Sequence, residues 1–261
     1  MKDTESPKKG EDASPAILIS DHGNVRVITL NNARRRNALD LKARIALVDA
    51  LRVAETEARA VVLTGAGGFF CAGGDIRSMS DDPHVAQERL DALAMLADQL
   101  VRSTVPVVAA VEGGAYGAGL SLVSAATYVV SSASASFEAS FGRIGLGPDT
   151  GLSWTLPRRI GHAKTRQMLM LALTLDGSSA REAGLVDEVV DDDLVLARAR
   201  EVATRLSELS APMVAGVNRL MAEDHASVGA ATAAEARLQI ALLGTPESLA
   251  LRTRFIGRSG T

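Results

Sequence analysis

The chain has 261 residues and a mass of 27.2 kDa, enough for one large domain or two small ones with a sizeable core. Hydrophobic residues make up 47% of it and charged residues 23%, a composition that excludes wholesale disorder. Its 28 Lys and Arg residues against 31 Asp and Glu residues leave a net charge of −3, and only 3% of residues are aromatic. Both values argue against a nucleic-acid partner, which requires a basic face or stacking platforms.

The N-terminal segment, residues 1–15, is polar and charged and has no apolar centre, so we expect a disordered extension rather than a signal peptide or anchor. No later run approaches the roughly 18 apolar residues of a membrane span, so we expect no membrane partner. The single cysteine, Cys71, rules out an internal disulfide and fits the reducing cytoplasm. The four histidines are scattered, without the close pairing of a zinc site. We therefore expect a cytoplasmic protein without a bound metal.

A hairpin, a helix and a strand are the first predicted elements. Ile17–Ser20 and Val25–Leu30 alternate as strands do around a cluster of turn residues. Asp40 is a suitable N-cap for a helix to about Glu57, and Ala60–Thr64 is typical of a short buried strand. The apolar stripe expected on that helix consists of Leu41, Ile45, Val48 and Leu51.

Predicted helices and strands continue to alternate through the middle of the chain, and the last third is mostly helical. A helix is predicted from about Ala86 to Arg102, strands at Val107–Val111 and Tyr128–Ser131, and a late helix at Asp193–Leu209. The expected apolar stripes are Leu90, Leu93, Ala97 and Leu100 on the earlier helix, and Val195, Ala199, Val202, Leu206 and Leu209 on the later one. This order predicts an α/β core followed by helices.

Many of the 23 glycines gather in two loops that follow predicted strands, Gly65–Gly74 and Gly113–Gly119. Small residues leave backbone N–H groups uncovered, and the second loop leads into an apolar helix that ends near Ala126. Two N–H groups aimed at one point would stabilise an oxyanion, although either loop alone is equally typical of a tight turn. Neither loop matches a phosphate P-loop or a dinucleotide fingerprint.

Taken together, these segments resemble the crotonase (enoyl-CoA hydratase/isomerase) superfamily. The resemblance rests on Leu30–Leu39, Val62–Gly65, Phe70–Ile76, Gly113–Gly119, Ile144–Gly151 and Ala183–Val190, in that order. It implies a spiral of ββα units over residues 16–200 and a helical C-terminal trimerisation region over 201–261. It further implies a homotrimer or a dimer of trimers that binds an acyl-CoA thioester, with coenzyme A as part of the substrate and no other cofactor.

The same resemblance assigns roles to individual positions. The backbone N–H groups of Gly74 and Ala118 would form the oxyanion hole that polarises the thioester carbonyl and holds an enolate. Segments that resemble the coenzyme A contacts of the family contain Arg36, Ala38, Ala72, Gly73, Asp75 and Ile76. The residue types alone indicate that Asp75 fixes its own loop by accepting backbone hydrogen bonds.

The resemblance also separates two reactions. Hydratases of the superfamily typically use two glutamates to activate water, and these align with Ser121 and Phe141, neither of which is a carboxylate. Asp149 resembles the carboxylate of Δ3,Δ2-enoyl-CoA isomerases and of epoxyphenylacetyl-CoA isomerases, and the surrounding segment is most similar to the second group. A single carboxylate beside an oxyanion hole suits a proton shuttle, and Phe141 would raise its proton affinity. The alternative for Asp149 is a helix N-cap ahead of Leu152.

Other candidates are weaker. Glu138 could replace a missing glutamate if the backbone path were altered, Glu112 is expected to lie at the surface or to brace its loop, and Cys71 is expected to pack. Arg252 and Arg254 could meet coenzyme A phosphates, although a solvated basic tail is the simpler interpretation. The sequence therefore predicts an acyl-CoA isomerase. A hydratase or lyase that adds water to 2-enoyl-CoA and an inactive CoA-binding homologue remain the alternatives.

Overall fold

A computed structural model describes residues 14–258, so nearly all of the predicted N-terminal extension lies outside the described residues. The larger sheet has the strand order β1-β2-β3-β4-β6-β9, with an antiparallel first pair and parallel pairs thereafter. Its strands are β1 (Ile17–His22), β2 (Val25–Leu30), β3 (Ala60–Gly65), β4 (Val107–Val111), β6 (Tyr128–Ser132) and β9 (Glu188–Val190). The predicted hairpin is confirmed, and β1 continues two residues further than expected.

A second sheet of three strands has the order β5-β7-β8. Its strands are β5 (Gly114–Tyr116), β7 (Ser136–Glu138) and β8 (Thr174–Asp176). None of them was predicted, and neither was β9, because three residues are too few to show an alternating pattern. Because β5 belongs to the second glycine loop, this small sheet places that loop at a defined position beside the larger sheet.

Helices cover both faces of the larger sheet, and the alternation of side chains along the strands divides the core accordingly. On one face, Ile28, Leu63 and Ala109 pack with residues of α1 (Leu41–Glu57), α2 (Pro83–Val101), α3 (Ala118–Ala125) and α4 (Leu152–Leu171). On the other face, Val27 and Val62 pack against α6 (Val195–Ser207). The short helix α5 (Gly177–Glu182) precedes β9.

Asp40 caps α1 as predicted, accepting a hydrogen bond from the Ala43 N–H, but two residues of the expected stripes are wrong. Ile45 and Leu90 are each 49% exposed, because α1 and α2 pack against each other and the sheet through neighbouring positions instead. Asp82 accepts from the first N–H groups of α2, so that helix begins at Pro83 rather than near residue 86.

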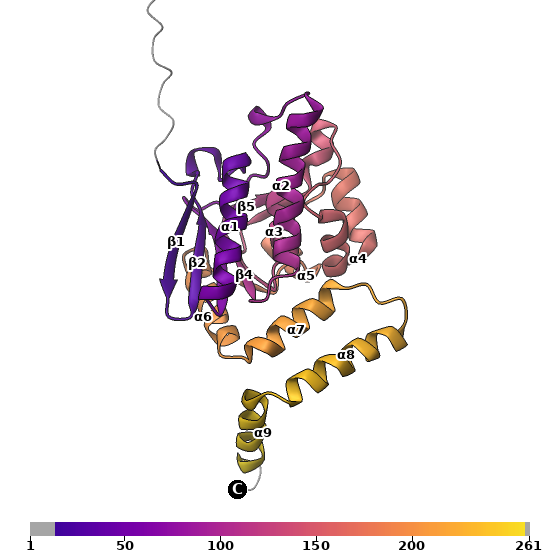
Figure 1. The fold of residues 1–261 in the computed structure, drawn as a ribbon. Coiled ribbons are helices and arrows are strands. Elements are labelled where there is room, and N and C mark those ends of the chain that lie inside the picture. The colour runs from indigo at the N-terminus through magenta and orange to yellow at the C-terminus, as the bar shows by residue number, and fades with distance from the viewer. Residues whose placement is uncertain (1–13, 259–261) are drawn as a thin grey trace, which may run out of the picture.

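Val195, Ala199 and Val202 are buried on α6 as expected, whereas Leu209 is 42% exposed because α6 ends at Ser207. The chain after α6 forms a C-terminal arm, residues 211–258, which contains α7 (Ala211–Ala222), α8 (Val228–Leu243) and α9 (Pro246–Arg258). Figure 1 shows α8 and α9 extending away from the α/β core. In the described part of the chain, no helix is both long and apolar enough to cross a membrane.

Candidate active site

Backbone pairing brings the two glycine loops together. The Cys71 N–H donates to the Gly114 carbonyl at 3.1 Å, and the Tyr116 N–H donates to the Cys71 carbonyl at 2.9 Å. A Cβ at Gly119 would lie 2.5 Å from the Cys71 carbonyl oxygen, so only glycine permits this approach. Cys71 is fully buried, and burial raises the pKa of its thiol to about 12. Cys71 is therefore a packing residue between the loops, as expected, and not a nucleophile.

The N–H groups of Gly74 and Ala118, one from each loop, have no hydrogen-bond partner among residues 14–258. Leu39 donates to the carbonyl of Gly73 at 2.8 Å and accepts from the N–H of Asp75 at 3.1 Å, which leaves the N–H of Gly74 pointing away from Leu39. Ala118 is the first residue of α3, where an N–H group has no partner within the helix. A Cβ at Gly73 would lie 3.5 Å from the Ala118 nitrogen, so the two donors belong to adjoining segments. This is the kind of arrangement that an oxyanion hole requires.

The two segments predicted to contact coenzyme A lie against each other. The Ala72 N–H donates to the Arg36 carbonyl at 2.8 Å. Arg36 is exposed, and its guanidinium lies 5.4 Å from the centre of the Phe69 ring. Ala38 is half-buried beside this pairing. A phosphate or adenine group would therefore find an accessible cation at this edge.

Asp75 and Ile76 belong to the second of these two segments. The Asp75 carboxylate accepts from the Arg77 N–H at 3.2 Å and from the Arg35 guanidinium at 2.6 Å. This agrees with the loop-fixing role predicted for Asp75 from its residue type. Ile76 is 57% exposed, so its side chain is accessible to a ligand.

Asp149 lies next to the first turn of α3. The Ser121 hydroxyl donates to the backbone carbonyl of Asp149 at 3.3 Å, and the Thr150 hydroxyl donates to its carboxylate at 2.9 Å. Burial raises the pKa of the Asp149 carboxyl, while the Thr150 hydrogen bond and the positive charge of Arg44 oppose that rise. Within the described residues the carboxylate forms no ion pair.

The alternative role of Asp149 as a helix N-cap is wrong. Helix α4 begins at Leu152, its N-cap is Gly151, and no side chain caps it. Only the backbone carbonyl of Asp149 accepts from the Leu152 N–H, at 3.1 Å. The carboxylate therefore has no structural task at the start of this helix.

Ser121 and Phe141 stand at the same turn. Ser121 is 1% exposed and also donates to the Gly117 carbonyl at 3.4 Å. Phe141 is 8% exposed, and its ring lies 3.7 Å from where a Cβ of Gly117 would be. Of the two positions aligned with hydratase glutamates, Ser121 therefore lies on the first turn of α3 and Phe141 lies beside the start of that helix, but they contribute a hydroxyl and an apolar ring.

The two remaining carboxylates are explained by their surroundings. Glu138 pairs with the Arg143 guanidinium at 2.7 Å and accepts from the Thr174 hydroxyl at 2.8 Å. Burial raises the pKa of Glu112, whose carbonyl accepts from the Phe70 N–H at 2.9 Å. The backbone of Glu112 thus braces the loop, as predicted, and Glu138 is committed to Arg143.

Sequence reasoning missed Arg44, which is 2% exposed on the buried face of α1. Its Nη2 atom lies 3.1 Å from where a Cβ of Gly74 would be. The available signal was a charged residue three and four positions before the buried Leu47 and Val48, on the face that should be apolar.

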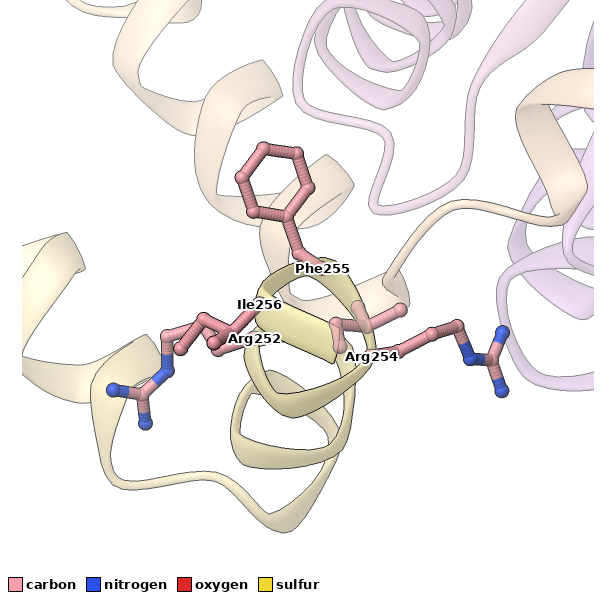
Figure 2. Close-up of a pocket in the computed structure, with 5 residues that line it drawn as sticks. Arg252, Arg254, Phe255 and Ile256 are labelled. Atoms are coloured by element: carbon pink, nitrogen blue, oxygen red, sulfur yellow. The ribbon is translucent and has the colours of Figure 1, made fainter. Parts of the chain in front are cut away.

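A hollow of about 580 Å³ lies far along the chain from these residues, on α9. Its lining comes entirely from that helix: Leu251, Arg252, Arg254, Phe255 and Ile256. Figure 2 shows Arg252 and Arg254 projecting to opposite sides of α9. Because Phe255 and Ile256 are 74% and 71% exposed, this is an open face of the arm rather than an enclosed site. Within the described chain, no group of three or more His, Cys, Asp or Glu side chains is arranged to hold a metal ion.

Known proteins are similar to this chain in sequence and in fold. The family described as enoyl-CoA hydratase/isomerase matches residues 20–248. A crystal structure of an enoyl-CoA hydratase from Polaromonas sp. JS666 superposes with a TM-score of 0.88 at 31% identity, covering 93% of this chain and 97% of that one. The 1,2-epoxyphenylacetyl-CoA isomerase of Escherichia coli K12 is 33% identical over 198 residues, 73% of this chain and 76% of that protein.

A Rhodobacter capsulatus protein named "Probable enoyl-CoA hydratase" is 39% identical over 167 residues. That match covers 64% of this chain and 65% of the relative, which is just under two thirds of its length. The architecture and the paired glycine loops define a protein of the crotonase fold. This chain belongs to the enoyl-CoA hydratase/isomerase family. The predicted family and fold class, with its C-terminal helices, are thus confirmed.

Proposed function

We propose that this protein isomerises the double bond of an enoyl-CoA, with Asp149 as the proton shuttle and the N–H groups of Gly74 and Ala118 as the oxyanion hole. The observation that carries the proposal is the environment of Asp149. The residue is half-buried, its backbone carbonyl accepts from Ser121 on the first turn of α3, partial burial raises the pKa of its carboxyl, and no cation neutralises the carboxylate by direct contact. A group that must accept a proton and then return it needs such an intermediate basicity.

The reaction follows from these positions. The thioester carbonyl of a 3-enoyl-CoA accepts hydrogen bonds from the Gly74 and Ala118 N–H groups, which makes the Cα proton acidic. The Asp149 carboxylate takes that proton, and the electron pair of the C–H bond is delocalised into a dienolate. The carboxylic acid then returns the proton at Cγ, the double bond moves to Cα–Cβ, and Asp149 is ionised again. Phe141 limits access of the water that would otherwise add.

The substrate test compares one reaction, the isomerisation of 3-enoyl-CoA, in the wild-type protein and in Asp149→Asn. We expect conversion of 3-enoyl-CoA to 2-enoyl-CoA, with loss of that activity in Asp149→Asn. Equal rates in the wild type and the variant would refute the assignment of Asp149.

Hydration is the second candidate, favoured by relatives whose names describe enoyl-CoA hydratases. Loss of enoyl-thioester absorbance with crotonyl-CoA measures it directly. Sustained hydration without isomerisation would replace our proposal with this one.

The third candidate is a homologue that binds acyl-CoA without turnover. Gly74→Pro tests it, because proline removes the N–H donor, and that donor has no partner within the described fold. If Gly74 serves an oxyanion hole, the rate should fall by about 10² to 10³. Tight binding of acyl-CoA with no rate in either protein would support the inactive homologue.

We also propose that the molecule assembles as a homotrimer or a dimer of trimers through the C-terminal arm. Large apolar side chains of the arm are exposed: Met221 at 74%, Val228 at 81%, Ile240 at 72% and Ile256 at 71%. An apolar surface of this kind is typically covered by another chain. Light scattering on the intact protein gives the mass, and a monomer would contradict this proposal.

The proposed proton transfer needs no cofactor beyond the coenzyme A of the substrate, because the polarised thioester itself accepts the electron pair. We further propose that the protein acts in the cytoplasm, where the thiol of Cys71 stays reduced.

A further inference from the structure

Arg44 carries a buried charge that the proposed reaction does not use. Its Nε donates to the Leu39 carbonyl at 3.2 Å and its Nη1 to the Arg89 carbonyl at 3.0 Å. The third donor group, Nη2, makes no hydrogen bond with any described residue. Burying a cation is costly unless an anion compensates it, so this arrangement requires an explanation.

The free end of Arg44 lies at the candidate active site. Nη2 is the one heavy atom beyond the chain neighbours of Gly74 that lies within 4 Å of a Cβ built at that residue, at 3.1 Å. Glycine at position 74 thus leaves the space that the guanidinium reaches. Arg44 is also near enough to Asp149 to act on its carboxyl electrostatically. The unused donor is therefore close to both the oxyanion donor and the proposed proton shuttle.

The buried cation beside Arg44 has no carboxylate partner either. Arg89 is also buried, and its guanidinium donates to the backbone carbonyls of Ser78 and Asp75 rather than to a carboxylate. Neither arginine forms an ion pair within residues 14–258.

The carboxylates that face Arg44 are those of Asp40, Asp75 and Asp149. Asp40 caps α1 by accepting from the Ala43 N–H, and Asp75 is paired with Arg35. None of the three carboxylates forms an ion pair with Arg44, so Nη2 has no anionic partner among the described residues.

We propose that Arg44 binds a carboxylate on the acyl group of the substrate, so that the preferred ligand is the mono-CoA thioester of a dicarboxylic acid. This inference rests on the proposed function, because it places the acyl group between Gly74 and Asp149. A carboxylate there would accept from Nη2 and form the ion pair that Arg44 lacks within the described residues. The Leu39 and Arg89 carbonyls hold the guanidinium in place before the ligand arrives, so little side-chain freedom is lost on binding.

The test measures the affinity of the wild-type protein for unreactive CoA thioesters by calorimetry. The chain-matched pairs are glutaryl-CoA with valeryl-CoA and succinyl-CoA with butyryl-CoA. In at least one pair the dicarboxylic thioester should bind about tenfold tighter or better, the gain expected of one charge-assisted hydrogen bond. Equal or weaker binding of the dicarboxylic ligand in both pairs would overturn the inference.

Substitutions on α1 test whether Arg44 causes the preference for the dicarboxylic ligand. Arg44→Met should abolish the advantage of the dicarboxylic ligand, and Arg44→Lys should retain part of it, because the charge remains but the planar fork is lost. Arg52→Met is the matched control: Arg52 lies on the same helix with its side chain 57% exposed, and the ratio should not change. An advantage that persists in Arg44→Met would refute the role of Arg44.

Three further outcomes are distinguishable. If 4-oxovaleryl-CoA binds as tightly as glutaryl-CoA, a neutral oxygen suffices and the carboxylate class is wrong. If valeryl-CoA and butyryl-CoA bind well and neither dicarboxylic ligand gains affinity, the inference fails and the proposed function stands. If no CoA thioester binds at all, the proposed function itself fails. The wild-type measurements decide these cases even if Arg44→Met does not fold.

Discussion

The two ends of the segment Glu138–Asp149 carry carboxylates in opposite environments. Glu138 is bound by Arg143 and Thr174, whereas Asp149 has a single hydroxyl donor, Thr150, and no ion pair in the described chain. Burial raises the pKa of Asp149 because nothing of opposite charge touches it. The comparison shows that a carboxylate is available for chemistry when the fold buries it without neutralising it.

The largest expected difference between the two carboxylates is in catalysis. Asp149→Asn should lower kcat/KM for 3-enoyl-CoA isomerisation by about 10³, within the range that general acid–base groups contribute. Glu138→Gln should change the same constant by less than about threefold, because the Arg143 pair is outside the proposed reaction path. Steady-state assays of the two purified variants check this. A severe loss in Glu138→Gln would restore Glu138 as the substitute for a missing glutamate.

Part of this arrangement could be predicted from the sequence, and the reason is physical. In the proposed oxyanion hole Gly74 and Ala118 would act through backbone N–H groups, and the small residues around them show where the chain leaves donors uncovered. Asp149 came from resemblance alone, and its residue type suggested a cap that the start of α4 at Leu152 excludes. Arg44 was hidden because one cation in a helical pattern looks like a solvent-facing position until the packing of α1 against α2 is known.

The sequence also does not show which faces of the helices pack together, and this explains the errors in the predicted fold. Ile45 and Leu90 are apolar and correctly spaced, but the faces that α1 and α2 bury are set by their contact with each other and with the sheet. The strands β5, β7 and β8 contain three residues each, too few for a pattern, and they are held by pairing between distant segments. Long-range pairing of this kind leaves no local signal.

A smaller difference is expected in stability, and its sign should reverse between the two residues. Glu138→Ala should lower the free energy of unfolding by about 1–2 kcal/mol, because the Thr174 bond and the pair with the exposed Arg143 are lost. Asp149→Asn should raise it at neutral pH, because an ionised carboxyl is no longer buried. Each kcal/mol corresponds to a shift of about 2–4 °C in Tm for a chain of this size.

The pH dependence of the stability that Asp149→Asn is expected to gain follows from the direction of the pKa shift of Asp149. Since the folded pKa of Asp149 is raised, the wild type loses stability as pH rises from the ordinary Asp value, near 3.9, through the folded value. The advantage of Asp149→Asn should therefore be present at neutral pH and disappear below about pH 4. Thermal melts at the two pH values test it, and a gain that is independent of pH would show that burial of the charge is not its cause.

The smallest expected effect, on the pH dependence of the rate, concerns the two threonines whose hydroxyl groups donate to these carboxylates. The Thr150 hydroxyl stabilises the ionised form of Asp149, so Thr150→Val should raise the pKa of that carboxyl further. The acid limb of the kcat/KM profile should then move to higher pH, by less than about one unit for one neutral hydrogen bond. Threonine and valine are both β-branched, so the substitution leaves the backbone cost of the positive φ at position 150 unchanged.

Thr174→Val is the matched control, because it removes the corresponding bond from Glu138 and should leave the acid limb in place. If both variants shift the limb equally, the titrating group is not Asp149 alone and the two carboxylates act as one coupled system. If only Thr150→Val shifts it, the pKa that controls the rate belongs to the carboxylate that the fold buries without a cation. The proton shuttle is then assigned by titration, independently of the loss of rate in Asp149→Asn.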